Sequence, residues 1–256
     1  MISVKLPLIS STLTIMTNAV IKASRGLLRD FSELENLQVS MKSNKNFVTN
    51  ADLKSDKILK EELLHARPTY SLLSEESPEI VGEDPSCRWI IDPLDGTVNY
   101  MHGFPHWAVS VALEKDGEIV AAATYDPVKN EMFQAEKGGG AFLNDRKIRV
   151  SGKRDLSGLL ITFGTLNNDI LPRVLTLAPS IRKTGSMTLN MAYLAAGRTD
   201  IMYSPHNPNK WDMAAGILLI KEAGGIIADK NGKQTNDHRE IFVMTNVNLL
   251  PHVLNF

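Results

Sequence analysis

The stretch Trp89-Ile90-Ile91-Asp92-Pro93-Leu94-Asp95-Gly96-Thr97-Val98-Asn99-Tyr100 decides how this chain is interpreted. Its first three residues are apolar and predict the buried end of a β-strand. Asp92 and Asp95 then flank a Pro-Leu turn, and carboxylates that leave a buried strand are costly unless they meet cations. Hard oxygen ligands at this spacing suit Mg²⁺, and the free N–H groups of Gly96 and Thr97 would point at an anion held by that metal. Taken alone, the same residues also fit a tight turn with an aspartate cap.

Composition is that of an ordinary globular protein. The chain has 256 residues, enough for one or two domains with a large core, and 43% of them are apolar and 22% charged. The formal net charge of −1 argues against a dedicated surface for nucleic acid or an anionic membrane. A single cysteine, Cys87, excludes an internal disulfide and fits a reducing compartment. No apolar run reaches membrane-spanning length, so we expect a cytoplasmic protein.

Apolar periodicity predicts the order of helices and strands. In the first part we expect a helix at 9–31, a strand at 37–41, a polar loop at 42–46, a helix capped by Asn50 and ending near His65, and strands at 70–73, 88–91, 107–114, 118–125 and 131–136. In the second part, strands at 159–163, 200–203, 226–229 and 241–245 alternate with helices at 170–177, 187–196 and from Trp211 to Gly224, followed by a short tail helix. This alternation indicates an α/β half.

Four further segments accompany the metal turn in a fixed order: 42–52, Ser74-Glu75-Glu76-Ser77, Gly185-Ser186 and Trp211-Asp212-Met213-Ala214-Ala215-Gly216. Together they resemble the inositol monophosphatase family of Mg²⁺-dependent, lithium-sensitive sugar phosphatases, especially its bacterial inositol-1-monophosphatase-like and extragenic suppressor branch. The resemblance spans nearly the whole chain. It implies an α+β / α/β fold, layered as an α-β-α-β-α sandwich of the inositol monophosphatase and fructose-1,6-bisphosphatase type, and a homodimer. We expect an N-terminal α+β half at 1–150 with most metal ligands and a C-terminal α/β half at 151–256 with Asp212 and substrate contacts.

The resemblance also implies a role for each site residue and two to three Mg²⁺ ions. Glu75, Asp92 and the Leu94 carbonyl would hold the first ion, and Asp92, Asp95 and Asp212 the second. Glu75 and Thr97 would orient the attacking water, with Asp52 polarising Thr97 and assisting a third ion. Phosphate would contact the Gly96 and Thr97 N–H groups, and the substrate contacts would be Asp95, Gly185, Ser186, Met187 and Lys42. Without metal, such crowded carboxylates would repel one another and have raised pKa values.

Several of these residues also have structural interpretations. Asp52 and Asp212 each fall in the predicted first turn of a helix, where a negative charge is favourable. Glu75, at the mouth of a strand, and Lys42, in a polar segment, could simply face solvent. The resemblance favours the site roles of Glu75 and Asp212, whereas for Asp52 and Lys42 both interpretations remain open.

The expected activity is hydrolysis of inositol monophosphate or a related small polyol or sugar phosphate by metal-activated water. Two departures leave the substrate open. Pro205 stands where the inositol enzymes commonly have glutamate, and Met187 stands where a small residue is usual. One alternative is a non-catalytic protein partner of the transcription or ribosomal RNA machinery, without direct nucleic-acid binding. Another is a nucleotide 3′-phosphatase or fructose-bisphosphatase of the same superfamily.

Overall fold

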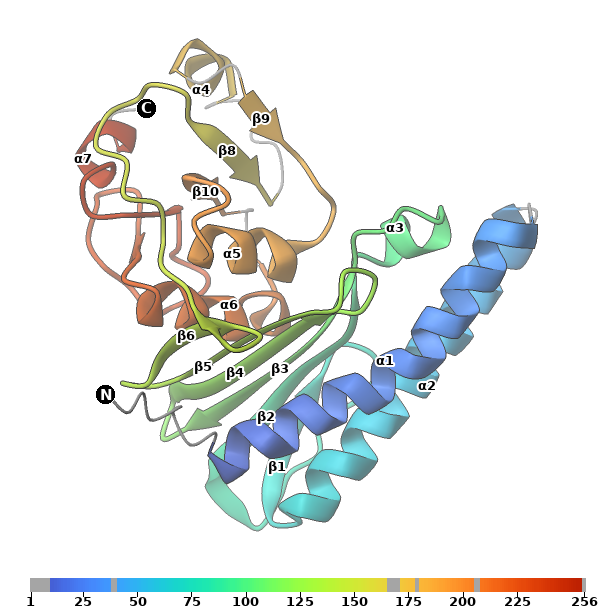
Figure 1. Cartoon of the computed structure of the whole chain (residues 1–256). Coiled ribbons are helices and arrows are strands. Elements are labelled where there is room, and N and C mark those ends of the chain that lie inside the picture. Colours follow the sequence, from blue (N-terminus) through green and yellow to red (C-terminus); the bar gives the residue numbers. More distant parts are fainter. Residues whose placement is uncertain (1–9, 38–40, 165–170, 178–179, 205–207, 255–256) are drawn as a thin grey trace, which may run out of the picture.

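The computed structural model describes residues 10–37, 41–164, 171–177, 180–204 and 208–254, with side chains for all of these except 34–37, 41–49, 173 and 177. Two long helices, α1 (Ser11–Leu37) and α2 (Met41–Ala66), lie side by side over one face of a seven-stranded sheet (Figure 1). The apolar residues of α1 recur at helical spacing and are buried against the sheet, among them Met16, Val20 and Leu27. The exposed face of α1 carries basic residues, as predicted.

The seven-stranded sheet follows chain order: β1 (Tyr70–Ser74), β2 (Asp84–Asp95), β3 (Ala108–Lys115), β4 (Glu118–Asp126), β5 (Glu131–Glu136), β6 (Gly140–Leu143) and β7 (Arg146–Lys147). Only β1 and β2 are parallel; the other neighbours are antiparallel. Side chains alternate between the faces, so Trp89 and Ile91 pack against α1 and α2, whereas Ile90 packs on the opposite face. Asp92 has the parity of Ile90 and therefore points away from α1 and α2.

That opposite face is covered by α5 (Met187–Ala195) and α6 (Lys210–Glu222), which form the central helical layer (Figure 1). The sheet presents small side chains to them, which let the helices approach closely: Ala108, Ala112, Ala122 and Ala135. Beyond the helices lies a second sheet in the order β11 (Ile226–Ala228), β12 (Val243–Thr245), β10 (Ile201–Tyr203), β8 (Leu160–Phe163) and β9 (Ser180–Arg182). Its outer face packs against α4 (Leu171–Leu177) and α7 (Leu250–Val253). The layers are therefore α-β-α-β-α, as predicted.

Two predictions near residue 40 are wrong. The predicted strand at 37–41 has helical residues at both of its described ends, since Leu37 ends α1 and Met41 begins α2, while 38–40 lie outside the described residues. The predicted polar loop at 42–46 is helical. Asn50 is therefore inside α2 and does not cap it. Polarity suggested a loop, but the segment contains neither glycine nor proline, and a solvent-facing helical turn can be just as polar. The other predicted elements form, but α1 continues to Leu37 beyond its predicted end at 31, and β2 runs from Asp84 to Asp95 where 88–91 was predicted. The short strands β6, β7 and β9 were not predicted.

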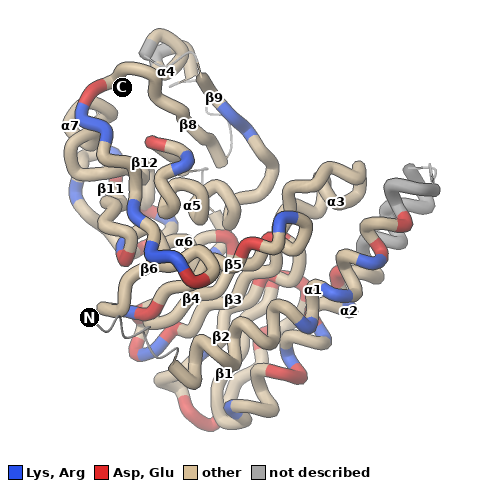
Figure 2. The backbone as a smooth tube through the Cα atoms, in the orientation of Figure 1, with Lys and Arg blue, Asp and Glu red and all other residues tan. Residues whose placement is uncertain are grey.

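In the part of the chain that the structure describes, the distribution of charged residues shows no large surface of one sign (Figure 2). Lysine and arginine are intermixed with aspartate and glutamate along the tube (Figure 2). Among the helices of the described residues, none combines the length and the apolar character that crossing a membrane requires.

Candidate metal centre

Three elements bring carboxylates to one place. The parallel strands β1 and β2 end at the same edge, with Ser74 opposite Ile91, so Glu75 emerges beside Asp92. Asp212 reaches the same point from the first turn of α6, which packs on that face of the sheet. Carboxylate oxygens of Glu75, Asp92 and Asp212 all lie within 4.8 Å of one another. The convergence expected from three distant segments is therefore present.

The turn after β2 is held by a few specific bonds. Asp92 is buried, and its Oδ1 accepts a hydrogen bond from the Leu94 N–H at 3.1 Å. The Thr97 hydroxyl, at the start of α3 (Thr97–Met101), donates to the Leu94 carbonyl at 3.1 Å. From α2, the buried Ser55 hydroxyl donates to the Pro93 carbonyl at 2.8 Å. These bonds fix the orientation of the Pro93 and Leu94 carbonyl groups. Asp92 Oδ2 is buried and has no hydrogen-bond partner.

Gly96 allows this turn to form. It has φ +94°, a left-handed conformation that disfavours other residues. A Cβ at this position would lie 3.1 Å from the His106 carbonyl oxygen and 3.3 Å from Trp107 Cα. The glycine of the Gly-Thr pair that the sequence singled out is therefore favoured by the backbone itself, in addition to its predicted contact with phosphate.

Asp95 has a different environment from the other acidic residues. Its Oδ2 accepts bonds from the Thr188 N–H at 2.8 Å, the Thr188 hydroxyl at 2.5 Å and the Ser186 hydroxyl, while Oδ1 accepts one from the Met187 N–H at 3.1 Å. A carboxylate at the N-terminus of α5 is also favoured by the helix dipole. Asp95 is not among the three closely grouped carboxylates. Its Oδ1 keeps free acceptor capacity, so its role as a ligand stays a prediction.

Asp52 lies inside α2, about three turns from its start, so its predicted place in a first helical turn is wrong. Its carboxyl group is buried and Oδ1 has no hydrogen-bond partner. Burial, followed by the negative charges of Glu76 and Glu75, raises the pKa of Asp52 to about 8. A favourable charge at a helix start therefore does not explain why aspartate stands at position 52. Its place beside Glu75 and Glu76 links Asp52 to the acidic cluster.

The cluster is electrostatically strained without a cation. The pKa of Asp92 is raised well above its usual range, first by burial and then by the negative charges of Asp95, Glu75 and Asp212. The pKa of Glu75 is raised to about 7, first by loss of water contact and then by the charges of Asp212 and Glu76. Glu75 is nevertheless on the solvent-exposed side of the cluster. Burial, then Asp95, raises the pKa of Asp212 to about 6. The ion pairs formed among described residues include none to Glu75, Asp92, Asp95 or Asp212. Converging carboxylates that pair with no cationic side chain of the described residues fit a divalent cation.

The predicted substrate residues are only partly described. Gly185 and Ser186 precede α5, and the Ser186 hydroxyl caps it by accepting a bond from the Leu189 N–H at 3.3 Å. Met187 is half-buried beside Asp95. The side chain of Lys42 and all of Pro205 lie outside the described residues. Sequence reasoning missed Thr188 and Ser55, because a hydroxyl within a helix carries no signal of the distant residue it contacts.

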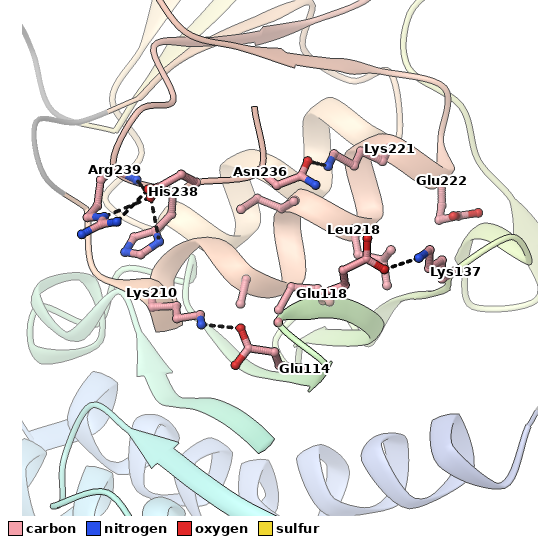
Figure 3. Close-up of a pocket in the computed structure, with 15 residues that line it drawn as sticks. Glu114, Glu118, Lys137, Lys210, Leu218, Lys221, Glu222, Asn236, His238 and Arg239 are labelled. Atoms are coloured by element: carbon pink, nitrogen blue, oxygen red, sulfur yellow. Dashed lines mark hydrogen bonds and ion pairs between the residues drawn. The ribbon is translucent and has the colours of Figure 1, made fainter. Parts of the chain in front are cut away.

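The cavity drawn in Figure 3 is separate from this cluster. It has a volume of about 460 Å³ and lies between the β3–β4 hairpin, α6 and residues 236–239. Lys210 donates to Glu114, Lys137 donates to Glu118, and Arg239 pairs with Asp237 at 2.7 Å. Carboxylates of the cavity pair with these three cations, whereas Lys221 donates to the amide oxygen of Asn236.

Comparisons with known proteins agree with this geometry. The profile of the Inositol monophosphatase family matches residues 9–252. Inositol-1-monophosphatase of Rhizobium meliloti is 48% identical over 232 residues, 87% of each chain, and Nus factor SuhB of Xylella fastidiosa is 40% identical, over 85% of this chain and 82% of that protein. The crystal structure of extragenic suppressor protein suhB from Bartonella henselae superposes with a TM-score of 0.86 at 43% identity, covering 96% of this chain and 98% of that one. In sequence and in fold, this chain belongs to the inositol monophosphatase family, a family of phosphatases.

Proposed function

We propose that this protein hydrolyses the phosphate monoester of inositol or of a related small polyol or sugar, with Mg²⁺ as its cofactor. The observation that carries this proposal is the convergence of Glu75, Asp92 and Asp212 oxygens within 4.8 Å, with a partnerless oxygen on buried Asp92. Two to three Mg²⁺ ions held by Glu75, Asp92, the Leu94 carbonyl, Asp95 and Asp212 would supply charge neutralisation and a water of lowered pKa. Relatives named Inositol-1-monophosphatase, at 48% and 41% identity, support this substrate class.

The protein residues have distinct tasks in this proposal. Glu75 lies at the open side of the cluster, where its carboxylate would orient the attacking water and accept its proton. Thr97 would turn its hydroxyl from the Leu94 carbonyl toward that water. Asp52, ionised once a cation is bound beside it, would polarise that hydroxyl. The Gly96 and Thr97 N–H groups bind the ester phosphate. The polyol would contact Asp95, Gly185, Ser186, Met187 and Lys42. Residues 1–150 would supply most metal ligands, and residues 151–256 would supply Asp212 and most substrate contacts.

The test is phosphate release from a panel of esters. It comprises inositol phosphates, sugar phosphates, histidinol phosphate and adenosine 3′,5′-bisphosphate, each with Mg²⁺, with Mg²⁺ plus Li⁺, and after thorough chelation. We expect turnover of one or more polyol monophosphates with Mg²⁺, inhibition by Li⁺ and no turnover after chelation. Preferred turnover of the nucleotide or of fructose bisphosphate would assign the alternative activity, and undiminished turnover after chelation would refute the metal-dependent mechanism.

A second candidate function follows from relatives named Nus factor SuhB, at 40% identity for Xylella fastidiosa. The name suggests a protein partner in transcription. A variant that lacks metal ligands, such as Asp95→Asn, separates the two functions. If this variant still rescues a deletion phenotype, the partner role is the physiological function. If rescue fails while the fold is intact, the phosphatase activity is the physiological function. A cytoplasmic homodimer completes the proposal and is tested by fractionation and light scattering.

A further inference from the structure

The side chain of Asn99 joins two segments of the site that are far apart in the sequence. Its Nδ2 donates to the Thr184 carbonyl at 2.8 Å and to the His106 carbonyl at 2.7 Å. Both protons of one amide group are therefore used on backbone oxygens. One acceptor belongs to the loop after α3 and the other to the segment that precedes α5.

The segment held by Asn99 leads directly to Asp95. Gly185 has φ +87°, and a Cβ there would lie 2.8 Å from Asn99 Oδ1 and 2.9 Å from Nδ2, so the backbone passes against the amide with no spare room. The next residue, Ser186, donates its hydroxyl to Asp95 Oδ2, and Thr188 donates both its N–H and its hydroxyl to the same oxygen. The position of this segment thus decides where the donors to Asp95 lie.

The Thr184 hydroxyl joins the segment held by Asn99 to α5 itself, because it donates to Asn190 Oδ1 at 2.7 Å. Asn99 follows Asp95 by only four residues, so the metal turn and the α5 segment are joined twice, once through the Asp95 carboxylate and once through the Asn99 amide. Two connections between the same pair of segments fix an orientation that one connection leaves free to pivot.

We propose that Asn99 is a positioning residue, which holds the segment Thr184–Ser186 against the metal turn and thereby sets the orientation of Asp95 toward a divalent cation and the substrate. This inference rests on the proposed function for its kinetic consequences, but not for its consequence on Mg²⁺ binding. A residue that merely stabilises the fold would change the folded fraction without changing the affinity of the folded molecules.

Asn99→Ala is compared with Asn246→Ala as a matched control. The Asn246 Nδ2 also bridges two backbone carbonyls, those of Ser151 at 2.8 Å and Lys153 at 3.0 Å, away from the carboxylate cluster. Mg²⁺ affinity is measured by titration calorimetry, and the Mg²⁺ concentration for half-maximal activity, KM and Tm are measured in parallel. We expect Asn99→Ala to weaken Mg²⁺ affinity and raise KM by about tenfold each, and Asn246→Ala to lower Tm with both values unchanged.

An Asn99→Ala protein with wild-type Mg²⁺ affinity and KM, and only a lower Tm, would overturn the inference. Should this variant not fold, Asn99→Ser, which keeps one donor, is judged by the same criterion. The inference and the proposed function fail separately. If the wild type hydrolyses no ester in the panel, the function is wrong, yet calorimetry still compares Mg²⁺ binding between the variants.

Discussion

The acidic cluster should make the metal-free protein less stable as pH rises, the reverse of ordinary acid denaturation. Asp52 is the clearest source, because it is 4% exposed and its pKa is raised from 3.8 to about 8. Between these two pH values the folded protein keeps a proton that the unfolded chain has released. The unfolded state then binds fewer protons than the folded state, so the free energy of unfolding falls with increasing pH.

The size of the effect follows from the pKa shift. Each pH unit within the window lowers the free energy of unfolding by at most about 1.4 kcal/mol. Between pH 5 and pH 8, Asp52 alone should therefore remove roughly 3–4 kcal/mol. For a chain of this size, about 2–4 °C of Tm corresponds to each kcal/mol, so Tm should fall by roughly 10 °C. The raised pKa values of Asp92, Glu75 and Asp212 act in the same direction.

The assay is thermal unfolding of the chelated protein from pH 5 to pH 8, repeated at saturating Mg²⁺. We expect Mg²⁺ to remove most of the slope, since the cation replaces the protons. Asp52→Asn should flatten the metal-free slope and raise Tm at pH 8. Asp237→Asn is the control, because Arg239 lowers the pKa of Asp237 to about 2 and this carboxylate does not titrate in the window. A metal-free Tm that stays flat or rises with pH, or an Asp52→Asn slope equal to that of the wild type, would refute the reasoning.

Three further substitutions test the supports of the site. Gly96→Ala should lower the free energy of unfolding by about 1–3 kcal/mol in urea and reduce turnover, because of φ +94° and the nearby His106 carbonyl; Gly158→Ala, at φ +60° in open space, should cost less and leave turnover intact. Ser55→Ala should lower the free energy of unfolding by about 1–2 kcal/mol and lower kcat, since it frees the Pro93 carbonyl; unchanged kcat would show that the turn does not need this bond. Thr188→Val should reduce kcat/KM by about tenfold with an unchanged circular dichroism spectrum, and full activity would show that its hydroxyl bond to Asp95 is dispensable.

The layered fold could be predicted largely from the sequence, because its elements carry strong local signals. Strands such as β3, β4 and β5 are apolar segments separated by short turns, and their predicted limits differ from the observed ones by about one residue. The start of α2 could not be predicted in this way. Residues 42–46 are all polar, and nothing in their composition distinguishes a polar helical turn from a loop.

Some residues of the site could likewise be predicted from the sequence, and others could not. Glu75, Asp92 and Asp95 could be found because each follows an apolar strand, where a charge needs a partner. Asp52 and Asp212 could be found because the order of the motifs resembles a known family. The supporting hydroxyl and amide groups could not. The bonds from Thr188 to Asp95 and from Asn99 to Thr184 span more than eighty residues, and no local pattern records a partner at that distance.

Burial and function are opposed in this cluster, and a divalent cation would reconcile them. The packing that brings Asp92 against α6 also removes water from its carboxylate, and the same packing brings Asp212 close enough to repel it. Because Glu75 and Asp92 come from the first sheet and Asp212 comes from the central helical layer, a cation that binds all three binds only the docked arrangement. By mass action it would then stabilise the packing of α6 on the sheet as well as the site. Catalytic competence and the stability of the packed layers would therefore be coupled through the same ion.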